Sequence, residues 1–426
     1  MNYKQAEEYI HSKLIFGSKP GLKRISALLD KLNNPQNDLK VIHIAGTNGK
    51  GSTATFISNI LIEAGYKTGL YLSPYVYEFK ERISYNRTLI SNDDFAKTIT
   101  YIKPFVESLD ESPTEFEILT AAALLYYKEI HCDFVILETG LGGRFDATNV
   151  IKSPLCSIIT SISLDHMQYL GNTIKEIAFE KSGIIKEGCE TISYPLQVKE
   201  AISEIKASAI SKHSKLIVPD ISSLNNVLIS DDTISFDYKK TSYTLHTMAK
   251  YQVYNFVTAA ECIRLLNEKK IINVSNDDIQ KSLLKFYIPA RLEYISKNPT
   301  IIIDGSHNQD GIKSLTTTLS DIIKGNKLIT ILGILEDKNY KNIIEQISSI
   351  SDRIITITPT SERALQGEKS ATIAKQFCND AIYCEHFEDA CYKALEYSKK
   401  EKAIILVTGS FTISNDIKNI FKKLNI

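Results

Sequence analysis

The sequence predicts an α/β fold with two doubly wound domains, of which the second is the smaller. The 426 residues are too many for one ordinary hydrophobic core, so two or three domains are expected. A strand, a glycine-rich loop, a helix and another strand follow one another between residues 41 and 72. The alternation of strands and helices starts again at residue 300. We therefore expect sheets covered by helices in both halves of the chain.

The first strand–helix–strand unit defines the N-terminal domain. Val41–Ala45 is a short apolar run with β-branched residues, which is typical of a strand. After the polar loop Gly46–Ser52, apolar side chains recur at helical spacing in Thr53–Ala64, and Gly65 ends this helix. The other strands predicted for this domain are Thr68–Leu72, Phe134–Leu137 and Ser157–Ile162.

A different pattern precedes the C-terminal domain. The alternating runs Ile234–Tyr238 and Tyr243–His246 predict an antiparallel hairpin, and Tyr251–Asn267 predicts a helix. Two prolines at the ends of residues 289–299 predict a linker. We expect an N-terminal domain at 1–288, a hinge at 289–299 and a C-terminal domain at 300–426.

The C-terminal domain is predicted as a Rossmann-like unit that has no phosphate-binding loop of its own. Its strands are expected at Thr300–Ile303, Lys327–Leu332, Arg353–Thr358, Ala381–Cys384 and Ala403–Thr408. Its helices are expected near Gly311–Ile323, Lys341–Ile350, Ser370–Phe377 and Asp389–Lys399.

Composition and charge argue against several classes of function. Hydrophobic residues make up 43% and charged residues 23%, the balance of a packed globular protein. The 50 Lys and Arg residues equal the 50 Asp and Glu residues, which argues against a nucleic-acid partner. We find no secretory signal and no apolar run long enough to span a membrane. The seven cysteines form no C-x-x-C pair, so we expect reduced thiols in a cytoplasmic protein.

The loop after the first strand is the strongest functional motif. Its glycines let backbone N–H groups face one anion, the helix N-terminus adds partial positive charge, and Lys50 adds a full one. Ser52 offers a hydroxyl to Mg²⁺. The spacing is not the standard G-x-x-x-x-G-K-[ST], and the alternative is a glycine-rich turn without a ligand. We favour a loop that binds the phosphates of ATP, formed by Gly46, Thr47, Asn48, Gly49, Lys50, Gly51 and Ser52.

Two polar side chains follow strands beside this loop. Glu138 ends the run Phe134–Leu137, and His166 lies next to Asp165 just past the run Ser157–Ile162. Because ligands bind at the carboxyl ends of parallel strands, both are candidates for a Mg²⁺–ATP site. Acids at strand ends are common, and a lone histidine is more often structural. The nearby loop Gly46–Ser52 favours the interpretation that Glu138 and His166 belong to one Mg²⁺–ATP site.

Four other residues are weaker candidates. Lys181, near the end of a helix, is predicted to be an exposed cation. Asp304 and His307 lie between a strand and a helix, where Asp304 suits a ribose hydroxyl and His307 a phosphate or substrate. A structural Asp helix cap is an equal alternative. Arg291, in the predicted hinge, is suited to reach phosphates across a cleft between the domains.

The motifs also match a known family as a set. The most specific segment is Glu138–Asn149. The others, in chain order, are Phe16–Leu22, Gly46–Ser52, Leu72–Pro74, Thr114–Glu117, Leu164–His166, Glu180–Gly183, Pro289–Arg291 and Asp304–Asn308. Together they closely resemble the folylpolyglutamate synthase/dihydrofolate synthase family of the Mur ligase superfamily. The resemblance implies a Mur-ligase-like ATPase domain with a P-loop and a folate pocket, followed by a C-terminal glutamate-ligase domain.

The resemblance implies roles for residues around ATP. Lys50 and the loop amides match the groups that hold the phosphates, and Asn255, Arg291 and Asp304 match nucleotide contacts. The residues that match ligands of two Mg²⁺ ions are Ser52 for the first ion and Ser73, Glu138 and His166 for the second.

Four further roles are implied by the resemblance. Lys181 matches a lysine that is carbamylated in the family and helps to hold the second metal. His307 matches a histidine near the reacting groups, and Phe116 and Asp146 lie in segments that line the pterin pocket. The chain departs from the family pattern at Ser182, Ala290 and Gln309, which replace a common alanine, glycine and proline.

The implied reaction is an ATP-dependent addition of L-glutamate to the γ-carboxylate of (tetrahydro)folate through an acyl phosphate. Conversion of dihydropteroate to dihydrofolate is left open as a second activity. The expected partners are small molecules, not nucleic acid or membrane, and the expected state is a monomer. The alternatives are a Mur-type peptide ligase, a small-molecule kinase with a P-loop, and a non-catalytic nucleotide-binding protein. The first is disfavoured because the 45 residues before Gly46 are too few for a further nucleotide-binding domain.

Overall fold

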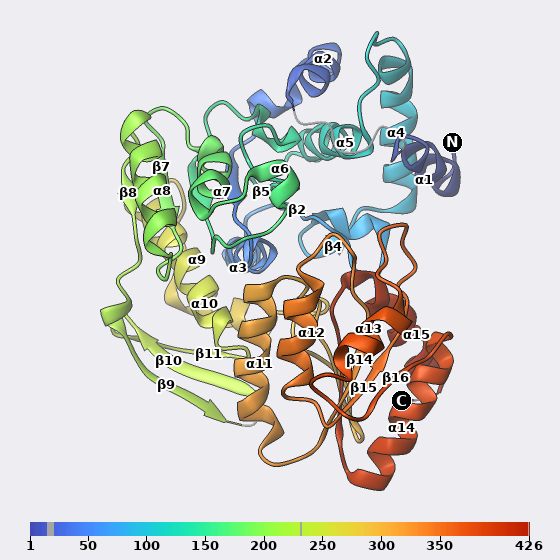
Figure 1. The fold of residues 1–426 in the computed structure, drawn as a ribbon. Helices are drawn as coiled ribbons and strands as arrows, with labels where there is room; N and C mark the ends of the chain where they lie inside the picture. Colours follow the sequence, from blue (N-terminus) through green and yellow to red (C-terminus); the bar gives the residue numbers. More distant parts are fainter. Residues whose placement is uncertain (15–20, 231, 425) are drawn as a thin grey trace.

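The computed structural model describes residues 1–14, 21–230, 232–424 and 426, and the predicted fold class is confirmed. Two α/β domains are present, with a small antiparallel sheet beside them (Figure 1). Most of the Phe16–Leu22 motif lies outside the described residues. The described helices include none with the length and apolarity that a membrane span requires.

The N-terminal sheet has eight strands in the order β4-β3-β2-β5-β1-β6-β7-β8. The strands from β2 to β8 in this order run parallel, whereas β3 and β4 are antiparallel at one edge. The bounds are β1 Val41–Ala45, β2 Thr68–Tyr71, β3 Ile83–Tyr85, β4 Thr88–Leu89, β5 Phe134–Glu138, β6 Cys156–Ile159, β7 Glu190–Ser193 and β8 Leu216–Ile217.

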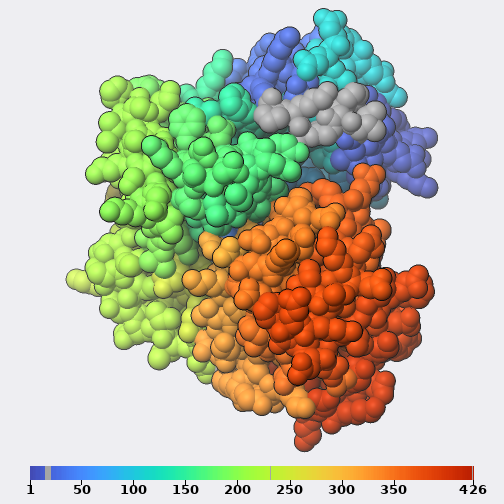
Figure 2. Space-filling view, in the orientation of Figure 1, coloured from blue at the N-terminus to red at the C-terminus, as the bar shows by residue number. Residues whose placement is uncertain are grey.

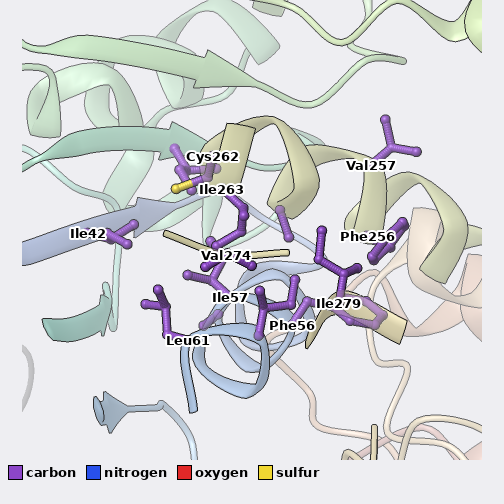
Figure 3. Packing of buried hydrophobic residues seen from close by; sticks show 14 of the residues in the cluster. Ile42, Phe56, Ile57, Leu61, Phe256, Val257, Cys262, Ile263, Val274 and Ile279 are labelled. Carbon is purple, nitrogen blue, oxygen red and sulfur yellow. The ribbon is translucent and has the colours of Figure 1, made fainter. Parts of the chain in front are cut away.

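Helices cover both faces of this sheet because neighbouring strand residues point to opposite sides. Ile42 of β1 packs in the core formed with α3 (Lys50–Glu63), α9 (Tyr251–Glu268) and α10 (Asn276–Leu284), as Figure 3 shows. Val41 packs in the core on the other face. The helices of that second core are α1 Tyr3–His11, α2 Lys23–Lys31, α4 Asn92–Glu107 and α5 Glu115–Glu129. The remaining helices of this half are α6 Met167–Leu170, α7 Ile174–Lys181 and α8 Lys199–Ser211.

The small antiparallel sheet contains the predicted hairpin, β10 (Thr233–Tyr238) and β11 (Thr241–Leu245). The alternation that predicted it is a burial pattern: Phe236 packs on Phe256 of α9, with ring centroids 5.6 Å apart. A third strand, β9 (Leu224–Ser230), was not predicted. Most of its residues are exposed, so no buried face produces a period of two in the sequence.

The C-terminal sheet contains all five predicted strands and one more, in the order β12-β13-β17-β14-β15-β16. The additional strand, β12 (Glu293–Lys297), lies inside the segment predicted as a hinge and pairs antiparallel with β13. The prolines on either side of it had indicated a linker. The other strands are β13 Thr300–Ile303, β14 Leu328–Leu332, β15 Arg353–Thr356, β16 Ala381–Tyr383 and β17 Ile404–Thr408. The helices are α11 Gln309–Ile323, α12 Tyr340–Ser348, α13 Gly367–Ala374, α14 Phe387–Glu401 and α15 Ser414–Lys423.

Candidate active site

The two α/β domains meet at loops that follow their strands. Asn48, after β1, and Asn308, after β13, exchange two side-chain hydrogen bonds of 3.2 and 3.0 Å. Figure 2 shows the C-terminal domain, in orange and red, packed below the N-terminal domain. The loops at the carboxyl ends of strands from both sheets therefore face each other, and such ends are where α/β proteins bind ligands.

Close contacts require two glycines in the loop after β1. A Cβ atom at Gly46 would lie 1.8 Å from Oγ1 of Thr160, and one at Gly49 would lie 2.4 Å from Oδ1 of Asn255. Gly49 also has φ +87°, a conformation that glycine adopts without strain. The predicted nucleotide contact Asn255 thus packs directly against the loop.

Helix α3 begins inside the loop, at Lys50, three residues earlier than predicted. Gly49 is its N-cap, and among the described residues no side chain caps this helix. The first N–H groups of a helix have no partner within it, so those of Lys50, Gly51 and Ser52 are suited to bind an anion. The loop therefore has the geometry of a phosphate site.

Glu138, at the end of β5, is buried beside this loop. Its Oε1 lies 3.9 Å from Nζ of Lys50, and its Oε2 accepts a 3.0 Å hydrogen bond from the N–H of Ser73. Arg82 donates to the hydroxyl of Ser73 at 3.1 Å. Burial raises the pKa of the Glu138 carboxyl, and Lys50 opposes this change. A buried carboxylate with so distant a cation is suited to bind a metal ion.

The side chains predicted to bind the second Mg²⁺ are brought together only in part. Ser73 contacts Glu138, but in the described part of the chain no hydrogen bond or ion pair joins His166 to either of them. Nor do the described residues contain a group of three His, Cys, Asp or Glu side chains placed to hold a metal. Burial lowers the pKa of His166 to about 4, so its ring is neutral at pH 7, the form that binds metals. The donors fit Mg²⁺ if phosphate oxygens or water complete the site.

Lys181 is not the exposed cation that its position in the sequence predicts. Its side chain is buried, and Nζ donates to the carbonyl oxygen of Gly46 at 2.7 Å. Burial and then the charge of Lys50 lower the pKa of Lys181 to about 7. The sequence cannot reveal this because the partner of Nζ, the carbonyl group of Gly46, lies 135 residues away along the chain.

Asp165 forms the polar centre of the contact between the domains. Its carboxylate accepts from Nζ of Lys338 at 2.6 Å and from the amide of Asn308 at 3.1 Å, and Nε2 of His307 lies 3.8 Å away. Both charged partners are buried, with 7% of the Asp165 side chain and 5% of the Lys338 side chain exposed. Burial alone would raise the pKa of Asp165, but His307 and Lys338 hold it well below its usual range. His307 thus lies at the domain contact.

Asp304 and Arg291 lie at the junction of the hinge and the C-terminal domain. The Asp304 carboxylate accepts from the N–H groups of Leu292 and Ser306, both at 2.9 Å, so it shapes the two loops. The alternative interpretation of Asp304 as a helix cap is wrong, because Asn308 caps α11. The Arg291 guanidinium lies 4.6 Å from the ring centroid of Phe411.

A cavity of about 520 Å³ lies beside this site; we call it the Phe116 cavity. The hydrogen bonds between Thr114 and Glu117 begin α5 and set Phe116 in the cavity wall, with its ring against Gly140. Asp146 also lines the cavity. Its carboxylate accepts four hydrogen bonds from residues 140–148, so its oxygens organise the wall.

Comparison with known proteins identifies the family. Residues 44–263 match the Mur ligase middle domain, and residues 290–411 match the Mur ligase glutamate ligase domain. A dihydrofolate synthase/folylpolyglutamate synthase from Bacillus subtilis (strain 168) is 38% identical over 435 aligned positions that cover 99% of both chains. The chain belongs to the dihydrofolate synthase/folylpolyglutamate synthase family.

Two further relatives agree with this family. A folylpolyglutamate synthase from Lacticaseibacillus casei is 30% identical over 98% of both chains. The structure of Mycobacterium tuberculosis folylpolyglutamate synthase complexed with ADP and AMPPCP has a TM-score of 0.90 and 28% identity, again over 98% of both chains. The protein is an ATP-dependent ligase that acts on small molecules, as the sequence predicted.

Three polar residues of this ligase site were not predicted. Arg82 contacts Ser73, and Lys338 and Asn308 contact Asp165. Asn308 ends a matching motif, which was a usable signal. Lys338 follows β14 and belongs to no motif that the sequence shows. Only the packing of the two domains identifies Asp165 as its partner.

Proposed function

We propose that this ligase adds L-glutamate to the γ-carboxylate of tetrahydrofolate and also converts dihydropteroate to dihydrofolate. The supporting observation is the position of Ser73, which lines the Phe116 cavity and bonds to Glu138 beside the phosphate loop. An acceptor whose pterin lies against Phe116 therefore has its carboxylate end near the γ-phosphate of ATP. The relative from Bacillus subtilis carries both activities in its name.

The proposed division of labour follows the two domains. Residues 1–288 bind ATP and the acceptor, 289–299 form the hinge, and 300–426 form the glutamate-ligase domain, with β12 joining its sheet. Lys50 and the amides of Gly46–Ser52 hold the phosphates, while Asn255, Arg291 and Asp304 contact the nucleotide. We place the enzyme in the cytoplasm, in keeping with its free cysteines, and we propose that it is a monomer.

The proposed reaction has two steps. A carboxylate oxygen of the acceptor attacks the γ-phosphorus of ATP, ADP leaves, and an acyl phosphate forms. The amine of L-glutamate then attacks the carbonyl carbon, and inorganic phosphate leaves as the amide forms. Lys50 offsets the charge on the transferred phosphoryl group, and His307 faces the reacting groups. The buried contact between Lys338 and Asp165 holds the domains together and excludes water that would hydrolyse the intermediate.

We assign the Mg²⁺ sites to Ser52 for one ion and to Ser73, Glu138 and His166 for the other. When bound, Mg²⁺ supplies positive charge that stabilises the phosphates during transfer. We also propose that Lys181 is carbamylated. Carbon dioxide reacts with the neutral form of an amine, and burial favours that form here. Intact mass under carbon dioxide tests this, since Lys181→Gln should lose the added mass.

The function is tested by product mass. The protein is incubated with ATP, Mg²⁺ and L-glutamate, with tetrahydrofolate or dihydropteroate as acceptor. We expect phosphate release that requires both glutamate and acceptor, and products that gain one glutamyl unit with each acceptor. Activity with tetrahydrofolate but not with dihydropteroate would show that the protein does not convert dihydropteroate to dihydrofolate. ADP formation with a phosphorylated acceptor and no amide would instead support a kinase.

A further inference from the structure

His43 is a buried imidazole in the middle of β1, and the proposed reaction gives it no part. None of its surface is exposed. Burial, and then the charge of Lys186, lowers the pKa of His43 to about 3. The ring is therefore neutral at pH 7 and carries one N–H. Because β1 leads directly into the phosphate loop, His43 lies on the strand that presents this loop to ATP.

The partners of the ring decide which nitrogen carries the proton. Nε2 lies 2.8 Å from the hydroxyl oxygen of Thr148, which is 105 residues away along the chain. That hydroxyl donates its only proton to Oδ1 of Asp146 at 2.5 Å. The Thr148 oxygen must therefore accept from His43, which places the ring proton on Nε2 and leaves Nδ1 as an acceptor. Among the described residues, Nδ1 is buried and has no hydrogen-bond partner.

This chain of hydrogen bonds ends in the wall of the Phe116 cavity. The Oδ2 atom of Asp146 accepts from the N–H groups of Gly140 and Leu141, at 3.0 and 2.8 Å. Asp146 lines the cavity together with these two residues, whereas Thr148 does not line it. The orientation of the Asp146 carboxylate therefore fixes this part of the wall, and Thr148 holds that orientation from outside the cavity.

Packing alone does not explain a histidine at this position. A buried acceptor without a partner, such as Nδ1 of His43, costs stability, and an apolar side chain of similar size would fill the space without that cost. What the imidazole adds is one donor, which faces the Thr148 oxygen. Hydrogen bonds in a chain polarise one another at low dielectric, so this donor strengthens the bond from Thr148 to the Asp146 carboxylate.

We propose that His43 is a positioning residue for the acceptor, acting through Thr148 on the carboxylate of Asp146. This role rests on the proposed function, in which the acceptor lies in the Phe116 cavity. The neutral ring fixes the Thr148 hydroxyl. That hydroxyl and the N–H of Thr148 together hold Oδ1 of Asp146, so that Oδ2 stays bonded to the N–H groups of the wall. Because β1 also leads to the phosphate loop, the same chain ties the acceptor wall to the strand that presents the loop.

Two substitutions break the chain at different links. His43→Leu removes the donor, and Thr148→Val removes the hydroxyl while keeping the shape of the side chain. In steady-state ligation we expect each to raise the KM for tetrahydrofolate and for dihydropteroate by about tenfold, as for one lost hydrogen bond to a charged group. The kcat and the KM for ATP should stay within about twofold of wild type, because the loss affects acceptor binding alone. The double variant should resemble either single variant, since both break one chain.

Two further variants separate positioning from packing. His43→Gln places an amide N–H near the position of Nε2, so it should restore most of the acceptor affinity that His43→Leu loses. Ser157→Ala is the matched control, because Ser157 is equally buried and is the register partner of His43 on β6. Its hydroxyl donates to the carbonyl oxygen of Ile184 at 2.8 Å, and neither residue lines the Phe116 cavity. This control should leave the KM for both acceptors unchanged.

An unchanged acceptor KM in folded Thr148→Val would overturn the proposed role of His43, and this variant decides the question even if His43→Leu does not fold. A double variant whose loss is the product of the two single losses would also overturn it, as would equal rises in KM in His43→Gln and His43→Leu. So would a rise in Ser157→Ala as large as that in His43→Leu, since any change in this core would then weaken the acceptor site. Failure of the proposed function is separate, because the wild type would then ligate glutamate to neither acceptor.

Discussion

The two domains build the same strand–loop–helix unit and use it in opposite ways. In the N-terminal domain, β1 leads to α3, whose N-cap is Gly49 and whose first N–H groups no described side chain caps. In the C-terminal domain, β13 leads to α11, where the Asn308 side chain accepts from the N–H of Gly311 at 2.9 Å. One helix start is open to an anion, and the other is closed by its own side chain.

The loop after β13, whose helix start is closed by Asn308, joins the two domains instead. Asn308 also bonds to Asn48 of the open loop and to Asp165, beside the buried Lys338. The comparison shows that one local fold can serve as a ligand site or as a joint between domains, depending on whether a side chain occupies the helix start. Four changes test this difference, in order of expected effect.

The open loop should be the more sensitive to loss of charge. We expect Lys50→Ala to lower kcat at least about a thousandfold, because it removes the full charge at the phosphate site. Lys40→Ala, at the other end of β1, is the matched control. Steady-state ligation measures the effect, and thermal unfolding checks that both variants remain folded. Near-normal turnover by a folded Lys50→Ala variant would show that the loop does not take part in the mechanism as proposed.

The closed loop should be the more sensitive to loss of its buried partner. Lys338→Met leaves Asp165 buried without its cation, which should cost about 3–5 kcal/mol in the free energy of unfolding. Lys341→Met, on the exposed face of α12, should cost little. Urea unfolding of both variants measures the difference. Equal stabilities would mean that the Lys338–Asp165 pair does not hold the domains together.

Acid should weaken both domains through buried histidines. Burial lowers the pKa of His43, on β1, to about 3 and that of His307 to about 4. Between these values and about 6.5 the unfolded chain binds more protons than the folded one, so stability falls as pH decreases from 6.5. Each histidine lowers the free energy of unfolding by up to about 1.4 kcal/mol for each pH unit below about 6.5. Urea unfolding at pH 7 and 5 measures the loss of stability, and His43→Gln should make that loss smaller. A loss that is unchanged in His43→Gln would contradict its attribution to this buried histidine.

The smallest expected effect is a change in stability from a substitution at the junction between the domains. Ala290 has φ +50°, a left-handed conformation that favours glycine. An L-residue costs about 1–2 kcal/mol in this conformation, offset by about 0.4–1 kcal/mol of chain entropy in glycine. Ala290→Gly should therefore stabilise the protein by up to about 1.6 kcal/mol in thermal unfolding. A destabilised variant would show that the methyl group's packing matters more.

Patterns within one segment were predictable, and contacts between segments were not. The strand, loop and helix at 41–63 were identified from period and glycine content, and so was the hairpin at 233–245. Strand β9 was missed because its exposed residues leave no alternation.

The same division applies to the candidate site. Lys50 was predicted from the glycine-rich loop, and Glu138 and His166 were predicted because strand ends in one sheet share an edge. Lys338 lies 173 residues from Asp165, and no local pattern connects them. Lys181 looked exposed because its helix pattern does not show which loop covers it.

The central claim is that the acceptor carboxylate is phosphorylated where the Phe116 cavity meets the phosphate loop. The most direct measurement follows oxygen-18 placed in the γ-carboxylate of tetrahydrofolate. If an acyl phosphate forms, one labelled oxygen per amide will appear in the released inorganic phosphate, detected by mass or by phosphorus NMR. Phosphate that carries no label while the amide accumulates would contradict the account.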